Sequence, residues 1–169
     1  MTKGDFMLIM GIDPGIAMSG YGLISCENSG CRILEYGVIK TSAGLETPQR
    51  LRQIHEGYLS LIERYKPDAV AIEELFFNKN AKTIITVGQA RGAALLAAAL
   101  SNIEVFEYTP LQVKQAVVGY GRADKHQVQQ MIKIFFHLDE LPKPDDAADA
   151  LAVAVCHMNS YKLGKILYS

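Results

Sequence analysis

The chain has 169 residues, of which 49% are hydrophobic, and this length and composition suit one domain with its own core. Lys and Arg number 17 against 18 Asp and Glu, so the strong positive charge of many nucleic-acid-binding proteins is absent. This balance argues against a DNA-binding role unless acidic residues bind cations, which add positive charge where a phosphate would lie. We expect a single domain over residues 1–169, with flexible ends at 1–5 and 161–169.

The cysteines and the absence of a leader pattern bear on the compartment. Cys26, Cys31 and Cys156 lack a metal-type CxxC spacing, and their odd number suits a reducing compartment. Cys26 and Cys31 could face each other across a turn, but a disulfide is not expected there. No charged segment followed by an apolar run opens the chain, and no stretch approaches the ~20 apolar residues that span a bilayer. We therefore expect a cytoplasmic protein.

The first part of the chain has patterns typical of strands. Apolar runs bounded by turn residues predict strands over 6–12, 21–26 and 32–39. The first run is followed by Asp13, Pro14 and Gly15, so this strand would deliver a carboxylate to a turn. The short, turn-rich connection between the second and third runs favours an antiparallel meander.

Helices and two further strands alternate through the rest of the chain. Helical spacing predicts helices over 47–65, 83–100, 111–117, 125–136 and 147–158, and short apolar runs predict strands over 69–72 and 105–108. Thr109, Asp124 and Asp145 are expected to cap the last three helices. Three antiparallel strands followed by two strands between helices predict an α/β fold, with a mixed five-stranded sheet covered by helices on both faces.

The helix expected over 83–100 has an unusual composition. It is rich in Ala and Gly, and Gln89 and Arg91 are the large polar residues in its middle. A helix that is apolar nearly all round needs partners on more than one face. A central helix of the monomer and a helix shared with a second subunit are equally compatible with this pattern.

Four acidic residues stand where a carboxylate has little structural use. Asp13 and Glu73 end two of the predicted strands, and Asp146 and Asp149 share one face at the start of the last helix. In sheets of this kind, ligands bind at the carboxyl ends of the strands, so the four acids could converge. Burial and mutual repulsion would disfavour their ionisation unless a divalent cation binds them.

The available ligands are all oxygen atoms, which favours Mg²⁺ or Mn²⁺ over Zn²⁺. Two such ions about 4 Å apart can activate water and stabilise a leaving oxygen at phosphate. The pattern therefore predicts a metal-dependent nuclease.

Each acid also has a simpler interpretation. Asp13 before Pro and Gly could be a turn residue, and Asp146 could complement the helix dipole. Asp149 is harder to explain in this way, because Ala148 and Ala150 flank it within an apolar helix. Glu74 competes with Glu73, but strand alternation puts the two side chains on opposite faces, so only one can join the site.

Aromatic and basic residues near these acids suggest contacts to nucleic acid. Two phenylalanines follow the strand that ends in Glu73, beside basic and amide side chains, and further basic residues follow position 110. The alternatives are that one phenylalanine fills the core and that the basic residues form a solvated helix face. The residues expected to contact DNA, by base stacking or through phosphate, are Phe76, Phe77, Lys79, Lys82, Lys114, Arg122 and Lys125.

Six motifs in order resemble one known family. They are Gly11 to Gly15, continuing through Gly20 to Gly22; Ala71 to Phe76; Gly88 to Gly92; Gln112 to Lys114; and Asp146 to Ala152. Together they resemble the RuvC family of crossover junction endodeoxyribonucleases, or Holliday junction resolvases, from about Met7 to about Asn159.

The resemblance implies a ribonuclease H-like fold and a function in homologous recombination and DNA repair. It implies that Asp13, Glu73, Asp146 and Asp149 hold two Mg²⁺ ions, with Mn²⁺ as a substitute. Lys114 and Lys125 match basic residues near the scissile strand, and Phe76 matches an aromatic residue that stacks on bases at the junction centre. The family acts as a homodimer that nicks two strands of like polarity, in cooperation with the RuvA and RuvB branch-migration proteins.

Three other functions fit part of the sequence. The segment from Asp13 to Gly22 also resembles the phosphate loop of actin-like ATPases and sugar kinases, but that fold needs a second related domain. A ribonuclease H-like nuclease acting on RNA would carry much the same acids. A junction-binding module without activity is disfavoured, because an acidic cluster facing phosphate would weaken binding.

Overall fold

The computed structural model describes residues 6–75 and 80–168 of the chain. Its sheet contains five strands in the order β3-β2-β1-β4-β5. The strands are β1 (Phe6–Asp13), β2 (Met18–Glu27), β3 (Gly30–Lys40), β4 (Ala69–Glu73) and β5 (Glu104–Tyr108). β1, β2 and β3 pair antiparallel, whereas β4 is parallel to both β1 and β5. This arrangement confirms the predicted mixed sheet.

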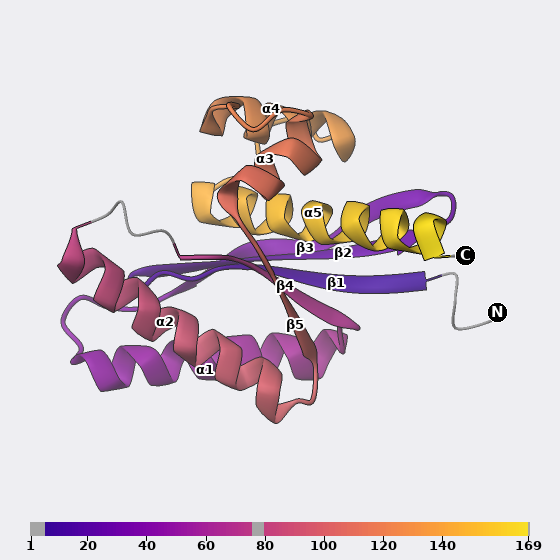
Figure 1. Cartoon of the computed structure of the whole chain (residues 1–169). Coiled ribbons are helices and arrows are strands. Elements are labelled where there is room, and N and C mark those ends of the chain that lie inside the picture. Colours follow the sequence, from indigo (N-terminus) through magenta and orange to yellow (C-terminus); the bar gives the residue numbers. More distant parts are fainter. Residues whose placement is uncertain (1–5, 76–79, 169) are drawn as a thin grey trace.

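Helices cover both faces of the sheet, as predicted. They are α1 (Thr47–Tyr65), α2 (Ala81–Leu100), α3 (Pro110–Val118), α4 (Lys125–Phe135) and α5 (Asp145–Tyr168). Figure 1 shows α1 and α2 on one face and α5 on the other, with α3 and α4 forming a further layer outside α5. α5 is therefore enclosed between the sheet and the α3–α4 pair.

The helix ends show which capping predictions were correct. Thr109 and Asp124 cap α3 and α4, each in a capping box with a glutamine three residues later. Asp145 does not cap α5, contrary to our prediction. It lies inside the first turn, and the carbonyl of Pro144 accepts the hydrogen bonds of the Ala147 and Ala148 amides at 3.0 and 3.3 Å.

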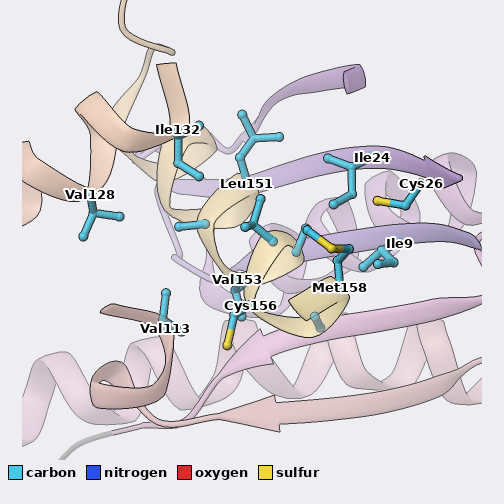
Figure 2. Packing of buried hydrophobic residues seen from close by; sticks show 14 of the residues in the cluster. Ile9, Ile24, Cys26, Val113, Val128, Ile132, Leu151, Val153, Cys156 and Met158 are labelled. Atoms are coloured by element: carbon cyan, nitrogen blue, oxygen red, sulfur yellow. The ribbon is translucent and has the colours of Figure 1, made fainter. Parts of the chain in front are cut away.

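The sheet separates two apolar cores because alternate residues of its strands point to opposite faces. On one face, Leu8, Met10 and Ile12 of β1 pack with α1 and α2. On the other face, Ile9 and Ile24 pack against α5, which also contacts Val128 and Ile132 of α4 (Figure 2). The second core fixes α5 over the middle of the sheet.

Two glycines allow α5 to lie directly on the strand backbones. A Cβ atom at Gly11 of β1 would stand 1.9 Å from the carbonyl oxygen of Ala150, and one at Gly20 of β2 would stand 2.0 Å from that of Asp146. Neither position can hold a side chain without displacing the helix. This close approach brings the first turns of α5 next to the end of β1.

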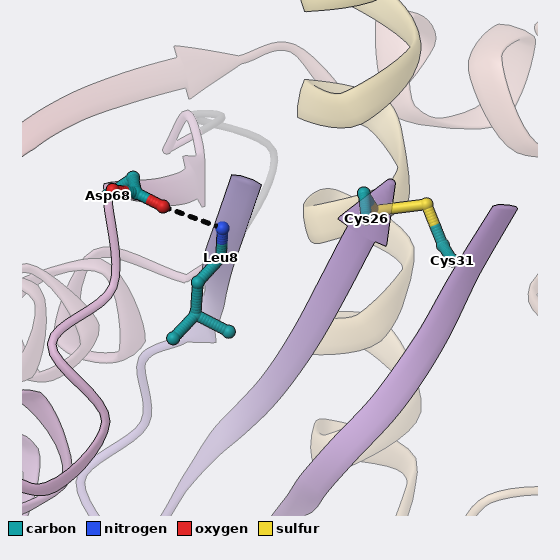
Figure 3. The surroundings of a disulfide bond; sticks show 4 residues. All are labelled: Leu8, Cys26, Cys31 and Asp68. Atoms are coloured by element: carbon teal, nitrogen blue, oxygen red, sulfur yellow. Dashed lines mark hydrogen bonds between the residues drawn. A yellow bond between two sulfur atoms is a disulfide. The ribbon is translucent and has the colours of Figure 1, made fainter. Parts of the chain in front are cut away.

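Cys26 and Cys31 form a disulfide between β2 and β3, which contradicts the expectation of free thiols (Figure 3). The two residues are directly paired in the antiparallel ladder, with Cα atoms 4.1 Å apart. Sequence spacing alone does not reveal this register. Figure 3 also shows the start of the central strand β1, where the carboxylate of Asp68 accepts the hydrogen bond of the Leu8 amide at 2.8 Å.

Two further expectations were wrong. α5 continues to Tyr168 rather than ending near Met158, so most of the segment 161–169 is helical. α2 is long and apolar enough, by length and composition alone, to cross a membrane, although we expected no such segment. In this fold, Ala90, Ala94 and Ala97 of α2 are fully buried beside α1 and the sheet.

Candidate active site

Asp13 and Glu73 end two neighbouring parallel strands on the face covered by α5. Asp13 follows Gly11 and Glu73 follows Ala71 at the alternate positions that face α5. β1 and β4 are paired in register up to Ile12 and Ile72, so the two acidic residues follow the last pair of the ladder. The predicted convergence of strand ends is therefore present.

α5 and α4 bring three more charged side chains to the same place. Asp146 and Asp149 lie in the first turns of α5, and Lys125 is the first residue of α4. All four predicted acids and Lys125 line one pocket of about 360 Å³. A smaller pocket of about 170 Å³ also includes Asp13, Glu73, Lys125 and Asp149, together with Lys114 and apolar residues of α3, α4 and α5.

The electrostatics of the pocket disfavour a full set of ionised carboxylates. Burial, together with the negative charges of Asp149, Asp146 and Glu73, raises the pKa of Asp13 to about 8, although Lys125 lowers it in part. Burial also raises the pKa of Asp149, and the hydrogen bond from Lys125 offsets this in part. This shift favours the protonated form of Asp13 when no other cation is present.

Lys125 is the counter-ion of this acidic pocket. Its Nζ lies 3.0 Å from Oδ2 of Asp149 and 3.4 Å from Oδ2 of Asp145. Burial disfavours its charged form, but the hydrogen bond and charge of Asp149, with a contribution from Asp145, outweigh burial and raise its pKa. Asp145 also accepts a hydrogen bond from Gln129 at 3.0 Å, so α4 and α5 are linked beside the pocket.

The residues present fit a hard divalent cation. The pocket sets the four predicted carboxylates against the single ammonium group of Lys125, so its negative charge exceeds its positive charge. Among the described residues, however, no three His, Cys, Asp or Glu side chains form a closed metal-binding cluster. The carboxylates share the pocket without converging on one point, and Lys125 contributes the positive charge.

The residues predicted to contact DNA are distributed around this pocket. Lys125 lines both pockets, and Lys114 lines the smaller one. Lys82, in the first turn of α2, and Arg122, before α4, are exposed and lie outside the lining of both pockets. Phe76, Phe77 and Lys79 lie outside the described residues.

Three residues near the site were not identified from the sequence. Glu74 also lines the larger pocket, so the prediction that only one of Glu73 and Glu74 could join the site was wrong. β4 ends at Glu73, and strand alternation does not apply beyond that point. Asp145 forms an ion pair with Lys125, which also forms an ion pair with Asp149. Arg91 of α2 donates a hydrogen bond to the main chain of Glu73. In the sequence, the one indication of such a role is that Arg91 is a cation within an Ala-rich helix.

Comparison with known proteins places the chain in a family. Residues 9–157 match the family model described as "Crossover junction endodeoxyribonuclease RuvC". A protein of that name from Alkaliphilus metalliredigens is 62% identical over 154 residues, which cover 91% of this chain and 94% of the relative. A similar protein from Clostridioides difficile is 56% identical over 161 residues, covering 95% of each chain.

Solved structures give the same result. The Thermus thermophilus RuvC structure in complex with a Holliday junction substrate superposes with a TM-score of 0.88 at 39% identity, covering 94% of this chain and 96% of that one. The yeast mitochondrial Holliday junction resolvase Ydc2 shares the fold, with a TM-score of 0.68 at 13% identity, over 95% of this chain and 80% of that one.

The sheet order, the helices on both faces and the strand-end carboxylates define a ribonuclease H-like nuclease. The chain belongs to the RuvC family of crossover junction endodeoxyribonucleases. This membership excludes the kinase-like and binding-module interpretations, and it identifies the chain as a hydrolase that acts on DNA and depends on a divalent metal ion.

Proposed function

We propose that this nuclease resolves four-way DNA junctions in recombination and repair, by hydrolysing one phosphodiester bond in each of two strands of like polarity. The observation that carries the proposal is the pocket at the carboxyl ends of β1 and β4, which is lined by Asp13, Glu73, Asp146 and Asp149. The chain that contains this pocket belongs to the RuvC family. The Holliday junction bound to the Thermus thermophilus relative supports the choice of substrate.

The four carboxylates are proposed to hold two Mg²⁺ ions, for which Mn²⁺ can substitute. When bound, these ions supply an activated water and charge stabilisation at the scissile phosphate. Asp13 would then lose its proton, because positive charge nearby favours the carboxylate form. A bound metal ion would compete with Lys125 for the carboxylate of Asp149, whose Oδ2 lies 3.0 Å from Lys125 Nζ.

Lys125 is proposed to turn from Asp149 to the phosphate backbone when the site is loaded. Its ammonium lies on the wall of the pocket and is already the charge partner of the acids, so only a side-chain rotation is required. Lys114 lines the neighbouring smaller pocket and can contact the same strand. Lys82, Arg122 and the segment containing Phe76, Phe77 and Lys79 are proposed to contact flanking DNA.

We also propose a homodimer that forms through α2. The face of α2 away from the core exposes Ile85, Leu96 and Leu100, whose exposed fractions are 62%, 52% and 63%. Gly92 lies between them in the helix, and apart from the adjacent turns of α2 itself nothing in the described part of the chain lies within 4 Å of where its Cβ would be. An apolar stripe with a small residue in its middle permits close packing of a second helix.

Cooperation with the RuvA and RuvB branch-migration proteins and a cytoplasmic location are proposed from family membership alone. The Cys26–Cys31 disulfide would be subject to reduction in that compartment.

The test is cleavage of a synthetic four-way DNA junction, beside a linear duplex and an RNA/DNA hybrid of matched sequence, with Mg²⁺ and with EDTA. Paired, metal-dependent nicks confined to the junction are expected. Cleavage of the hybrid alone, or no metal dependence, would contradict the proposal.

A further inference from the structure

Arg91 is a buried cation that does not line the pocket. It lies in the middle of α2, and its exposed fraction is 8%. Its Nη1 donates a hydrogen bond to the main-chain oxygen of Glu73 at 2.7 Å, and its Nη2 lies 2.6 Å from Oε2 of Glu107. The guanidinium therefore joins α2 to the ends of β4 and β5.

The first contact acts on the peptide group that follows Glu73. The carbonyl of Glu73 and the amide of Glu74 belong to one planar unit. Arg91 holds the oxygen of this unit, and the carbonyl of Tyr108 accepts the hydrogen bond of the Glu74 amide at 2.8 Å. Both ends of the peptide are fixed, so the main chain that orients the Glu73 side chain is fixed as well.

On the side of β5 the ladder includes Glu73, which pairs with Tyr108, but the side of β1 lacks such pairing. The pairing of β1 with β4 ends at Ile12 and Ile72, so β1 does not hold the main chain at Glu73. A hydrogen bond from a charged donor is about twice as strong as one between neutral groups. The planar guanidinium can contact the carbonyl and a carboxylate at once, which an ammonium group does less well.

The contact with Glu107 compensates the buried charge. Glu107 lies opposite Ile72 in the pairing of β4 with β5, and its side chain is half-exposed. The ion pair therefore keeps one partner in contact with solvent, while the guanidinium is directed at Glu73. Loss of Glu107 would leave the buried guanidinium of Arg91 poorly compensated.

We propose that Arg91 is a positioning residue of the metal site, which sets the affinity for divalent cations by holding the peptide after Glu73. The proposal rests on the proposed function, in which Glu73 is a metal ligand. Residues that orient metal ligands typically contribute a factor of 10 to 100 in metal affinity or activity.

The test is direct Mn²⁺ binding to the full chain without DNA, followed by electron paramagnetic resonance of free Mn²⁺, together with a Mg²⁺ titration of junction cleavage. Arg91→Met is expected to weaken Mn²⁺ binding 10- to 100-fold and to raise the Mg²⁺ concentration for half-maximal cleavage by a similar factor. Cleavage at saturating Mg²⁺ should recover toward the wild-type rate. Arg91→Lys should be intermediate, because an ammonium can hold the carbonyl without the full fork.

The matched control is Arg52→Met, which removes an exposed arginine paired with Glu56 on α1 and should leave both measurements unchanged. A purely structural role would lower the folded fraction of Arg91→Met without changing the Mn²⁺ affinity of the folded protein. If that variant does not fold, Arg91→Lys and Glu107→Gln provide the test, and unchanged Mn²⁺ binding in both would overturn the proposal.

Glu73→Gln distinguishes this proposal from the proposed function. Weaker Mn²⁺ binding in Glu73→Gln with normal binding in Arg91→Met would refute the positioning role alone. Normal binding in Glu73→Gln would refute Glu73 as a ligand and the role of Arg91 with it.

Discussion

α2 and α5 are both long, alanine-rich helices, yet they are buried to different extents. The stretch from Ala147 to Met158 of α5 is buried almost throughout, because the sheet covers one side and α3 and α4 cover the other. α2 packs on α1 and the sheet but has no second layer among the described residues, and its outer face exposes Ile85, Leu96 and Leu100. A helix that is apolar on all sides therefore needs packing partners on more than one face, but its composition does not show whether these partners belong to the same chain.

The largest expected effect comes from the charged end of α5. Asp149→Asn should reduce junction cleavage by about 100-fold or more, since a metal site contributes several kcal/mol to transition-state stabilisation. Junction binding in an electrophoretic mobility assay should change little, because the side chain keeps its size. A variant that cuts at the normal rate would remove Asp149 from the site.

The next prediction compares how closely the two helices are packed against the rest of the protein. Gly11→Ala should destabilise the protein by about 3 kcal/mol or more, because its Cβ would stand 1.9 Å from the carbonyl oxygen of Ala150 in α5. Gly92→Ala of α2 is the matched control, because no other described element lies within 4 Å of the added atom and helix propensity favours Ala by about 1 kcal/mol. Urea unfolding of both variants at low protein concentration measures the contrast, and equal effects would contradict it.

Charges on the outer face of α2 should prevent dimer formation. Ile85→Glu with Leu96→Glu is expected to raise the dimer dissociation constant about 100-fold, because both subunits carry the substitutions and each of the four half-exposed apolar side chains would contribute about 0.75 kcal/mol when its exposed part is buried. Sedimentation velocity over a concentration series measures this. Leu163→Glu, an equally exposed leucine on α5, should leave the association unchanged. A dimer that tolerates both α2 substitutions would place the interface elsewhere.

The buried polar group of α5 predicts a pH dependence. His157 is 2% exposed, its Nδ1 lies 2.7 Å from the hydroxyl of Tyr108, and burial lowers its pKa to about 4. The unfolded chain, with a histidine pKa near 6.5, binds more protons between these values, so stability should fall as pH drops from about 6.5 to 4.

His157 should contribute about 2 kcal/mol to this loss. Urea unfolding in EDTA at pH 7 and pH 4.5 should show a smaller pH effect in His157→Gln than in the wild type. Asp13 is present in both proteins, so its contribution cancels in this comparison. The raised pKa of Asp13 has the opposite effect to the lowered pKa of His157, because it makes stability fall as pH rises. An identical pH effect in both proteins would mean that His157 does not titrate differently on folding.

The smallest effect concerns the end of the sheet far from the pocket. Reduction of the Cys26–Cys31 disulfide with dithiothreitol should lower the free energy of unfolding by about 2 kcal/mol, since the closed loop is short. Cleavage at saturating Mg²⁺ should not change, because the hairpin lies at the opposite end of β2 from Gly20 and Asp13. A Cys26→Ala, Cys31→Ala variant is the control and should not respond to the reductant.

Much of the fold could be predicted from local patterns. The strands that end in Asp13 and Glu73 are short apolar runs with a carboxylate at the end, and the spacing of Asp146 and Asp149 places them on one helix face. These features do not depend on distant contacts, so the candidate site could be assembled from the sequence and the family motifs.

The features that were missed depend on tertiary contacts. The disulfide requires the register of β2 with β3, which spacing does not reveal. The contact of Arg91 with Glu73 requires the rotation of α2 against the sheet. The continuation of α5 beyond Met158 was hidden by polar residues such as Asn159 and Ser160, which weaken the apolar pattern, although they make hydrogen bonds to α3 and within α5.

The order of the elements along the chain affects when the nuclease can act. α5 follows every strand and supplies Asp146 and Asp149, as well as the layer that covers one face of the sheet. A growing polypeptide on the ribosome can therefore have Asp13 and Glu73 in place while half of the carboxylates are still to be synthesised. The enzyme should remain unable to cut DNA throughout translation until α5 has emerged and docked.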